Sequence, residues 1–213
     1  MRKRGNGLII MGLLLIAAAL FLAAANLYGG LLAERSARRA ADRLEALTPA
    51  QPSAGPENAE GSVGSQEFEV PDYVLNPEME MPEEEIDGVD YIGTLRIPAL
   101  GLELPIISRW SYPNLKAAPC RYAGSAYLDD LVIAAHNYPS HFGTLKDLSP
   151  GDEVTFTDMD GNVFRYEVAE LETLEPTAIE DMTAGDYALT LFTCTLGGAS
   201  RVTVRCSRVQ DLG

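Results

Sequence analysis

Residues 188–194 read ALTLFTC, and residues 201–206 read RVTVRC after a gap of six residues. Both segments are rich in apolar and β-branched residues, and the second alternates polar and apolar positions with the period of two that is typical of a strand. Gly197 and Gly198 lie between them and favour a turn. The two segments therefore predict a hairpin that brings Cys194 and Arg201 to the same edge of a sheet.

Similar short apolar runs recur throughout residues 91–213, separated by turn sequences such as DMDGN at 158–162. Only two brief helices are expected, around 112–116 and 144–148. Many short strands in about 120 residues predict an all-β domain, a small antiparallel barrel or sandwich. The other predicted strands are TLRIPAL, LELPIIS, LVIAAH, EVTFTD and FRYEVAEL.

The N-terminal part has a different character. Residues 8–25 are 18 consecutive apolar or glycine residues, which is long enough to span a bilayer as a tilted helix. Arg2, Lys3 and Arg4 precede this run, so a signal peptide cleaved near Ala23–Ala25 is the alternative. Because the apolar core of a signal peptide is usually shorter, we favour an uncleaved anchor in the cell membrane, with the C-terminal domain outside the cell.

The net charge of −15 is concentrated between the anchor and the domain. Residues 45–90 carry thirteen acidic and no basic side chains and are rich in Pro, Gly and Ser, which predicts a flexible linker. Phe68, Val70, Tyr73 and Val74 interrupt this polarity and are candidates for docking on the domain. The predicted organisation is anchor and juxtamembrane helix 1–47, linker 48–90 and domain 91–213. A domain this acidic argues against nucleic-acid binding.

The three cysteines differ in their predicted surroundings. Cys194 ends a strand and faces a loop, where a thiol is accessible. Cys206 shares a strand face with Val202 and Val204, so we expect it in the core. Cys120 stays undecided.

Two histidines could supply an imidazole. His136 follows the apolar run LVIAA, so it is expected at the end of the strand that this run forms. His141 lies in a polar loop, where we expect it to be solvated. A zinc site would pair these histidines with Cys194 or Asp147, but the spacing matches no standard ligand motif, so we expect neither a metal nor another cofactor.

Four segments together resemble the sortase family, over about residues 91–208. This resemblance implies a closed eight-stranded β-barrel in which Cys194 is the nucleophile, His136 the acid/base and Arg201 the stabiliser of the transition state. It also assigns substrate contacts to Thr193 and to the two neighbours of the histidine, Ala135 and Asn137. The segments are TLRIPALGLELPI (94–106), CRYAGSAYLDDLVIAAHN (120–137), FGTLKDLSPGDEV (142–154) and LTLFTC with SRVTVRC (189–206).

The sequence departs from the family in two places. Ala135-His136-Asn137 replaces the usual Gly-His-Arg triplet, and the loop between Cys194 and Arg201 is short. No Asp or Asn that could orient His136 is evident from the sequence.

The function implied by the resemblance is that of a membrane-anchored cysteine transpeptidase. Such an enzyme cleaves an LPXTG-like sorting signal of an exported protein through a thioacyl intermediate. It then transfers the protein to a peptidoglycan amine or a pilin lysine. The segment 175–187 is expected to read the signal. A catalytically silent anchored barrel that acts as a binding module, and a plain cysteine peptidase, are the alternatives.

Overall fold

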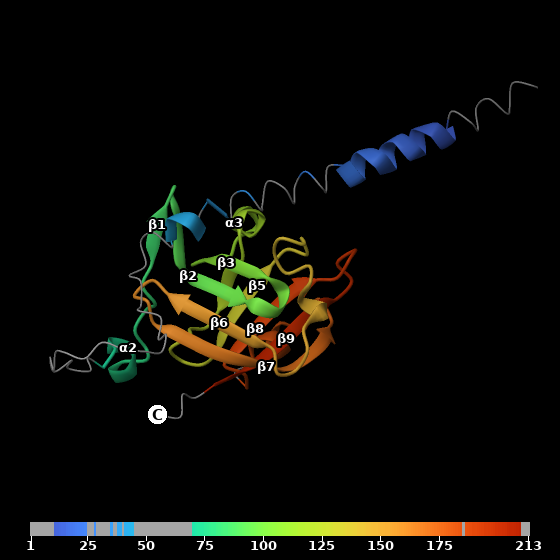
Figure 1. Cartoon of the computed structure of the whole chain (residues 1–213). Helices are drawn as coiled ribbons and strands as arrows, with labels where there is room; N and C mark the ends of the chain where they lie inside the picture. Colours follow the sequence, from blue (N-terminus) through green and yellow to red (C-terminus); the bar gives the residue numbers. More distant parts are fainter. Residues whose placement is uncertain are drawn as a thin grey trace, which may run out of the picture.

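Eight strands close into a barrel, and a ninth short strand extends it (Figure 1). The computed structural model describes residues 11–24, 28, 35, 38, 39, 41–44, 70–184 and 186–209. The strands of this described part are β1 (Glu84–Ile86), β2 (Val89–Ile97), β3 (Leu102–Ile107), β4 (Cys120–Ala123), β5 (Leu131–Ala135), β6 (Glu153–Asp158), β7 (Val163–Leu174), β8 (Leu189–Cys194) and β9 (Arg201–Arg208). Their order is β1-β2-β3-β4-β5-β8-β9-β7-β6, and pairing of β2 with β6 closes the ring.

The barrel is not purely antiparallel, which corrects the expectation drawn from the strand pattern. β5 runs parallel to β8, and β3 meets β4 in a parallel pair. The β6–β7 hairpin lies between β5 and β8 in sequence, so the chain crosses the barrel and returns in the same direction. The closed eight-stranded barrel that the family resemblance implied is confirmed.

The helices within residues 70–209 are short, and all but the first lie in the connections between strands. The helix predicted around 112–116 is α3 (Tyr112–Ala117), and the Ser111 side chain caps it by accepting a hydrogen bond from the Asn114 amide at 3.1 Å. The segment predicted around 144–148 is only a 3₁₀ turn, η2 (Leu145–Asp147). The remaining helical elements are α2 (Asp72–Leu75), η1 (Pro98–Leu100) and α4 (Ile179–Thr183).

The strands bury side chains on both faces. One cluster fills the barrel and includes Leu191, Ile133 and Val204. A second cluster lies on the outer face of the sheet and includes Phe192 and Ala134. Because successive residues of a strand point to opposite faces, β5 and β8 read as nearly continuous apolar runs.

The folded domain begins before residue 91, the start expected from the sequence. Met81 is 2% exposed within the barrel cluster, and β1 pairs with β2 before that point. Of the four apolar residues expected to dock, Tyr73 does: its ring stacks on Tyr127 with centroids 4.6 Å apart. Val70 and Val74 are exposed, and Phe68 lies outside the described residues. The acidic composition of this segment predicted a linker, because the few residues that are buried have little effect on the average composition.

Residues 11–24 form a helix within the predicted anchor. No helix that the described residues form is long and apolar enough to cross a membrane. The predicted span also includes residues 8–10 and 25, which lie outside the described part.

Candidate active site

The strand register brings the three predicted catalytic residues together. Ala135 of β5 pairs with Thr193 of β8, so His136 and Cys194 are each one residue beyond this parallel pair. On the other side of β8, Cys194 is the direct partner of Arg201 on β9. Neighbouring strands lie about 4.8 Å apart, so the three residues form one row across β5, β8 and β9.

The row lies on the outer face of the barrel. Leu189 and Leu191 point into the barrel, as do Ile133 and Ala135. The alternation of side chains therefore directs Cys194 and His136 outward, to the same side as Phe192 and Ala134 of the outer cluster. Cys194, His136 and Arg201 are all half-buried, so a ligand can reach them.

A tight loop places Arg201 opposite the thiol. Gly197 and Gly198 have φ angles of 84° and 74°, a region that favours glycine, and the Thr195 amide donates to the Ser200 carbonyl at 2.9 Å. Arg201 Nη1 donates to the carbonyls of Gly198 at 3.3 Å and Ser200 at 3.2 Å. Within the described chain only this nitrogen of the guanidinium has a protein acceptor, so Nε–H and Nη2–H can donate to a ligand.

His136 is held in a partly desolvated position that favours the neutral imidazole. Burial lowers its pKa below the ordinary value, and the positive charge of Lys116 lowers the pKa further. The Tyr138 ring lies against it, with ring centroids 5.0 Å apart. A neutral imidazole can accept a proton from a neighbouring thiol.

His141 is fully buried, so the expectation of a solvated side chain was wrong. The polar loop folds back on itself: the Phe142 amide donates to the His136 carbonyl, and the Phe142 side chain enters the barrel cluster. Among the residues that the structure describes, neither ring nitrogen of His141 has a hydrogen-bond partner. Burial, followed by the charge of His136, lowers the pKa of His141 to about 4.

The predicted substrate contacts have different surroundings. Thr193 and Ala135 are both buried, and the Thr193 hydroxyl donates to the Ala135 carbonyl at 2.8 Å. The Thr193 side chain thus ties β8 to the main chain of β5 below the catalytic row, so neither buried side chain is exposed to a ligand. Asn137 is half-buried beside His136.

All three cysteines are free thiols, but only Cys194 is accessible. Cys206 is fully buried in the barrel cluster, as its strand position predicted. Cys120, which the sequence left undecided, is fully buried in the outer cluster. Burial raises the pKa of each of these two thiols to about 12, so neither supplies a thiolate near neutral pH.

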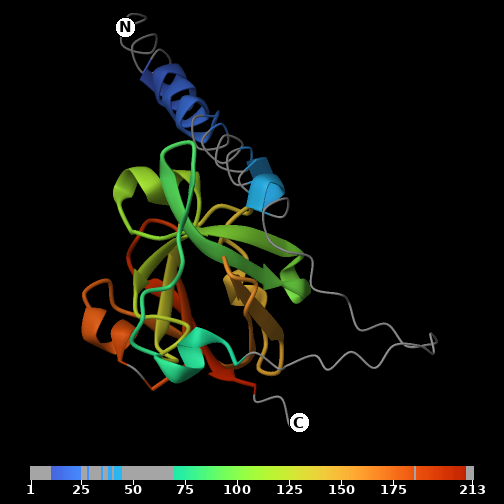
Figure 2. The same cartoon turned by 90° about the vertical axis from the view of Figure 1, so that its left-hand side faces the viewer.

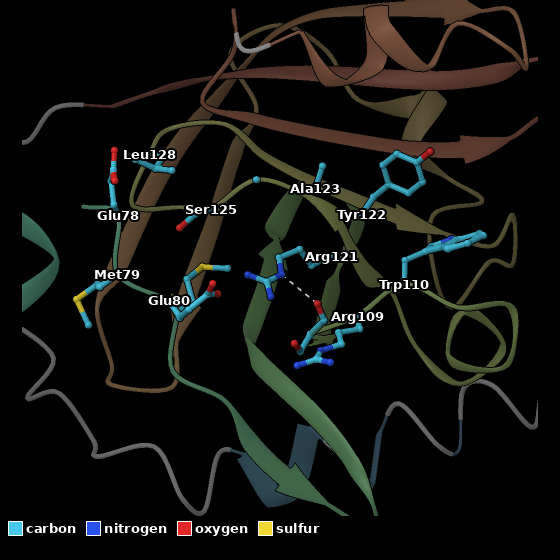
Figure 3. Close-up of a pocket in the computed structure, with 13 residues that line it drawn as sticks. Glu78, Met79, Glu80, Arg109, Trp110, Arg121, Tyr122, Ala123, Ser125 and Leu128 are labelled. Carbon is cyan, nitrogen blue, oxygen red and sulfur yellow. Dashed lines mark hydrogen bonds between the residues drawn. The ribbon is translucent and has the colours of Figure 1, made fainter. Parts of the chain in front are cut away.

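A row of aromatic rings leads from the catalytic face to a pocket of about 560 Å³. Phe192 contacts Tyr122 with centroids 5.2 Å apart, and Tyr122 contacts Trp110 at 5.9 Å. Figure 3 shows Tyr122 and Trp110 along one side of this pocket and Arg121 at its centre. The Arg121 Nε–H donates to the Ser108 carbonyl at 3.0 Å. No sequence pattern indicated this pocket, because its walls come from four separate segments.

The protein-family model that describes the sortase domain matches residues 95–209 of this sequence, which is more than half of the chain. The chain belongs to the sortase family. Sortases are cysteine transpeptidases, and the three residues to which the resemblance assigned the catalytic roles lie in one row across neighbouring strands. No curated protein matches this sortase in sequence.

Solved structures confirm the fold. Sortase C1 from Streptococcus agalactiae is 26% identical with a TM-score of 0.50, and the match covers 60% of this chain and 72% of that chain. A Clostridium perfringens sortase D5 transpeptidase is 22% identical with a TM-score of 0.52, covering 65% and 88%. The fold assignment does not depend on a third match, Sortase C1 of GBS Pilus Island 1, which is 23% identical with a TM-score of 0.49 and covers 57% of this chain and 66% of that chain.

Proposed function

We propose that this sortase is anchored in the cell membrane and cleaves an LPXTG-like sorting signal of exported proteins, which it then joins to an amine. The observation that carries the proposal is the row of His136, Cys194 and Arg201 on three adjacent strands. A silent barrel has no need of an accessible thiol beside an imidazole and a guanidinium. The apolar run at residues 8–25 supports the anchor and an extracellular domain.

The reaction follows from the three side chains. Neutral His136 accepts the thiol proton as Cys194 sulfur attacks the carbonyl of the signal, and two Arg201 donors stabilise the oxyanion. His136 then protonates the departing amine, so the C–N bond breaks and a thioacyl enzyme remains. An incoming amine, from peptidoglycan or a pilin lysine, gives a proton to His136 and displaces the sulfur.

We assign the pocket beyond Tyr122 to residues of the protein substrate that flank the signal. Its lining carries both signs of charge, positive from Arg109 and Arg121 and negative from Glu78 and Glu80. The aromatic row connects it to Phe192, which is two residues before Cys194. An extended peptide advances about 3.3 Å per residue, so a short stretch of substrate could reach both places.

The test compares wild type, C194A and C206A with a fluorogenic LPXTG peptide, with and without an added amine. We expect C194A to form no thioacyl enzyme and C206A to keep the activity with a modest loss of stability. Mass spectrometry of the products separates the alternatives. No thioacyl species in wild type would favour the silent barrel, and product that never contains the amine would favour a plain peptidase.

A further inference from the structure

Arg205 is a buried arginine whose donors converge on one connection of the barrel. The residue is 4% exposed on β9. Its Nε–H donates to Glu172 Oε1 at 2.6 Å. Its Nη2–H donates to the Asp181 carbonyl at 2.5 Å, and its Nη1–H donates to the Met182 carbonyl at 3.2 Å and to the Thr190 hydroxyl on β8 at 3.1 Å. The guanidinium also lies 5.5 Å from the centre of the Tyr187 ring.

The connection between β7 and β8 supplies three of these partners. The other two, Glu172 and Thr190, lie on β7 just before it and on β8 just after it. Glu172 is near the end of β7, Asp181 and Met182 belong to α4, and Tyr187 precedes β8. A buried guanidinium is costly unless its donors are satisfied. Displacing α4 would leave this charge without two carbonyl acceptors, so Arg205 holds the connection in one position.

Part of the connection packs on the outer face of the sheet, which carries the catalytic row. Met182 is 3% exposed and packs in the outer cluster together with Phe192 and Ala134. Phe192 and Ala134 each lie two residues before a catalytic residue, on the same face. In Figure 2, α4 (orange) stands at the side of the barrel.

We propose that Arg205 is a positioning residue that keeps the β7–β8 connection preformed as one wall of the peptide groove. This inference rests on the proposed function, because it takes the sorting signal as the peptide. Arg205 is too deeply buried to touch the substrate, so its effect falls on capture of the signal and not on the chemistry at Cys194. The fold supplies the preorganisation before the peptide arrives.

The experiment uses the full chain and compares R205Q and R205K with R208Q. Arg208 is a matched control on the same strand: it donates to Asp129 at 3.0 Å and lies 4.6 Å from the centre of the Phe164 ring, away from α4. Two quantities are measured, amide hydrogen exchange over residues 178–187 and the kinetics of LPXTG peptide cleavage. In R205Q we expect exchange to accelerate at least about tenfold and KM to rise about tenfold, with kcat within about threefold. R205K should give a smaller change in both quantities, because one ammonium cannot reach both carbonyls.

Two results would overturn the proposal. One is unchanged exchange in R205Q, and the other is an equal rise in KM in R205Q and R208Q, which would indicate general destabilisation. If R205Q does not fold, R205K together with E172Q tests the same anchor. If wild type cleaves no peptide, the proposed function fails, whereas the exchange measurement still decides whether Arg205 anchors the connection.

Discussion

Arg201 differs from an ordinary surface arginine because its Nε–H and Nη2–H have no protein acceptor within the described chain and belong to a residue that pairs with the accessible Cys194. Its Nη1 donates to two carbonyls of its own loop, which restrains the guanidinium of the residue that pairs with Cys194. Lysine would keep the charge but not the planar arrangement of donors. The substitution R201K therefore separates the effect of the positive charge of Arg201 from the effect of its planar donor geometry.

We expect R201K to lower the rate of thioacyl formation about 100- to 1,000-fold, as for the loss of an oxyanion donor. Peptide binding should change much less, because the oxyanion exists only transiently. The measurement is single-turnover acylation with one signal peptide. The control is R165K, because Arg165 on β7 is an exposed arginine outside the row. Acylation by R201K at the rate of R165K would remove Arg201 from the active site.

His141 predicts a dependence of stability on pH. Its pKa is lowered to about 4 in the folded chain, so between about pH 6.5 and 4 the unfolded chain binds more protons. Stability therefore falls as pH falls through this window. For a shift of this size the loss is about 3 kcal/mol. His136, which faces it across Tyr138, has a lowered pKa and acts in the same direction.

In H141L we expect a shallower loss of stability on acidification, because leucine removes the titrating group and no hydrogen bond of the ring is lost. Urea denaturation of both proteins near pH 7.5 and near pH 5 measures the difference. An equally steep loss in H141L would assign the acid sensitivity to other groups.

At the scale of elements, alternation and strand ends predicted much of the site. The run LVIAAH and the pair of segments around Gly197 correctly placed His136, Cys194 and Arg201 at strand ends. The parallel pairing of β5 with β8 was not predictable, because it joins residues 58 positions apart through contacts that no local pattern encodes. β4 was also missed, since CRYA is only four residues long and meets β3 through one residue pair.

The sequence also did not predict which single polar side chains are buried. The alternation of β9 placed Arg205 on the outer face, but only the folded connection shows that α4 covers it. His141 likewise sits in a segment of polar composition whose fold-back depends on Phe142 entering the barrel. Composition reports average exposure, whereas burial depends on which segment packs over a residue.

The segment before β2 behaves as part of the barrel. Deleting a buried methionine side chain costs about 2–5 kcal/mol, so M81A should lower the free energy of unfolding by an amount in this range. E85A, an exposed change on β1, should stay within about 0.5 kcal/mol of wild type. Thermal and urea denaturation give both values.

The same reasoning applies to the domain boundary. A chain that starts at residue 70 lacks Leu44 but should still fold, and a chain that starts at residue 91 should melt at a lower temperature or not fold, because it also lacks Met81, β1 and the first residues of β2. Equal melting temperatures for the two chains would show that residues 70–90 contribute nothing.

At the scale of the whole molecule, the acidic linker is not the sole connection between the N-terminal region and the barrel. Leu44 is fully buried in the outer cluster, beside β1 (Figure 1, light blue), and Arg43 Nη1 forms an ion pair with Asp87 at 2.8 Å. The exposed ion pair contributes little, so the apolar contact dominates. Leu44 lies 19 residues after the end of the apolar run at Ala25, a rise of about 29 Å if helical. With residues 8–25 in a membrane, this contact would hold the barrel near the bilayer and make the linker a loop instead of a spacer.

L44D tests this arrangement. Burying a leucine contributes about 1.5–3 kcal/mol, and a carboxylate cannot replace it in an apolar site, so the segment should detach. Trypsin should then cut after Arg43 faster than in wild type when the full chain is held in liposomes, and the distance from the bilayer to a dye on the barrel should increase. L75D is the matched control, because Leu75 is 77% exposed and adds the same charge without breaking a buried contact. If L44D and L75D are cut at the same rate and show the same distance, Leu44 does not tether the domain, and the linker alone sets its height above the membrane.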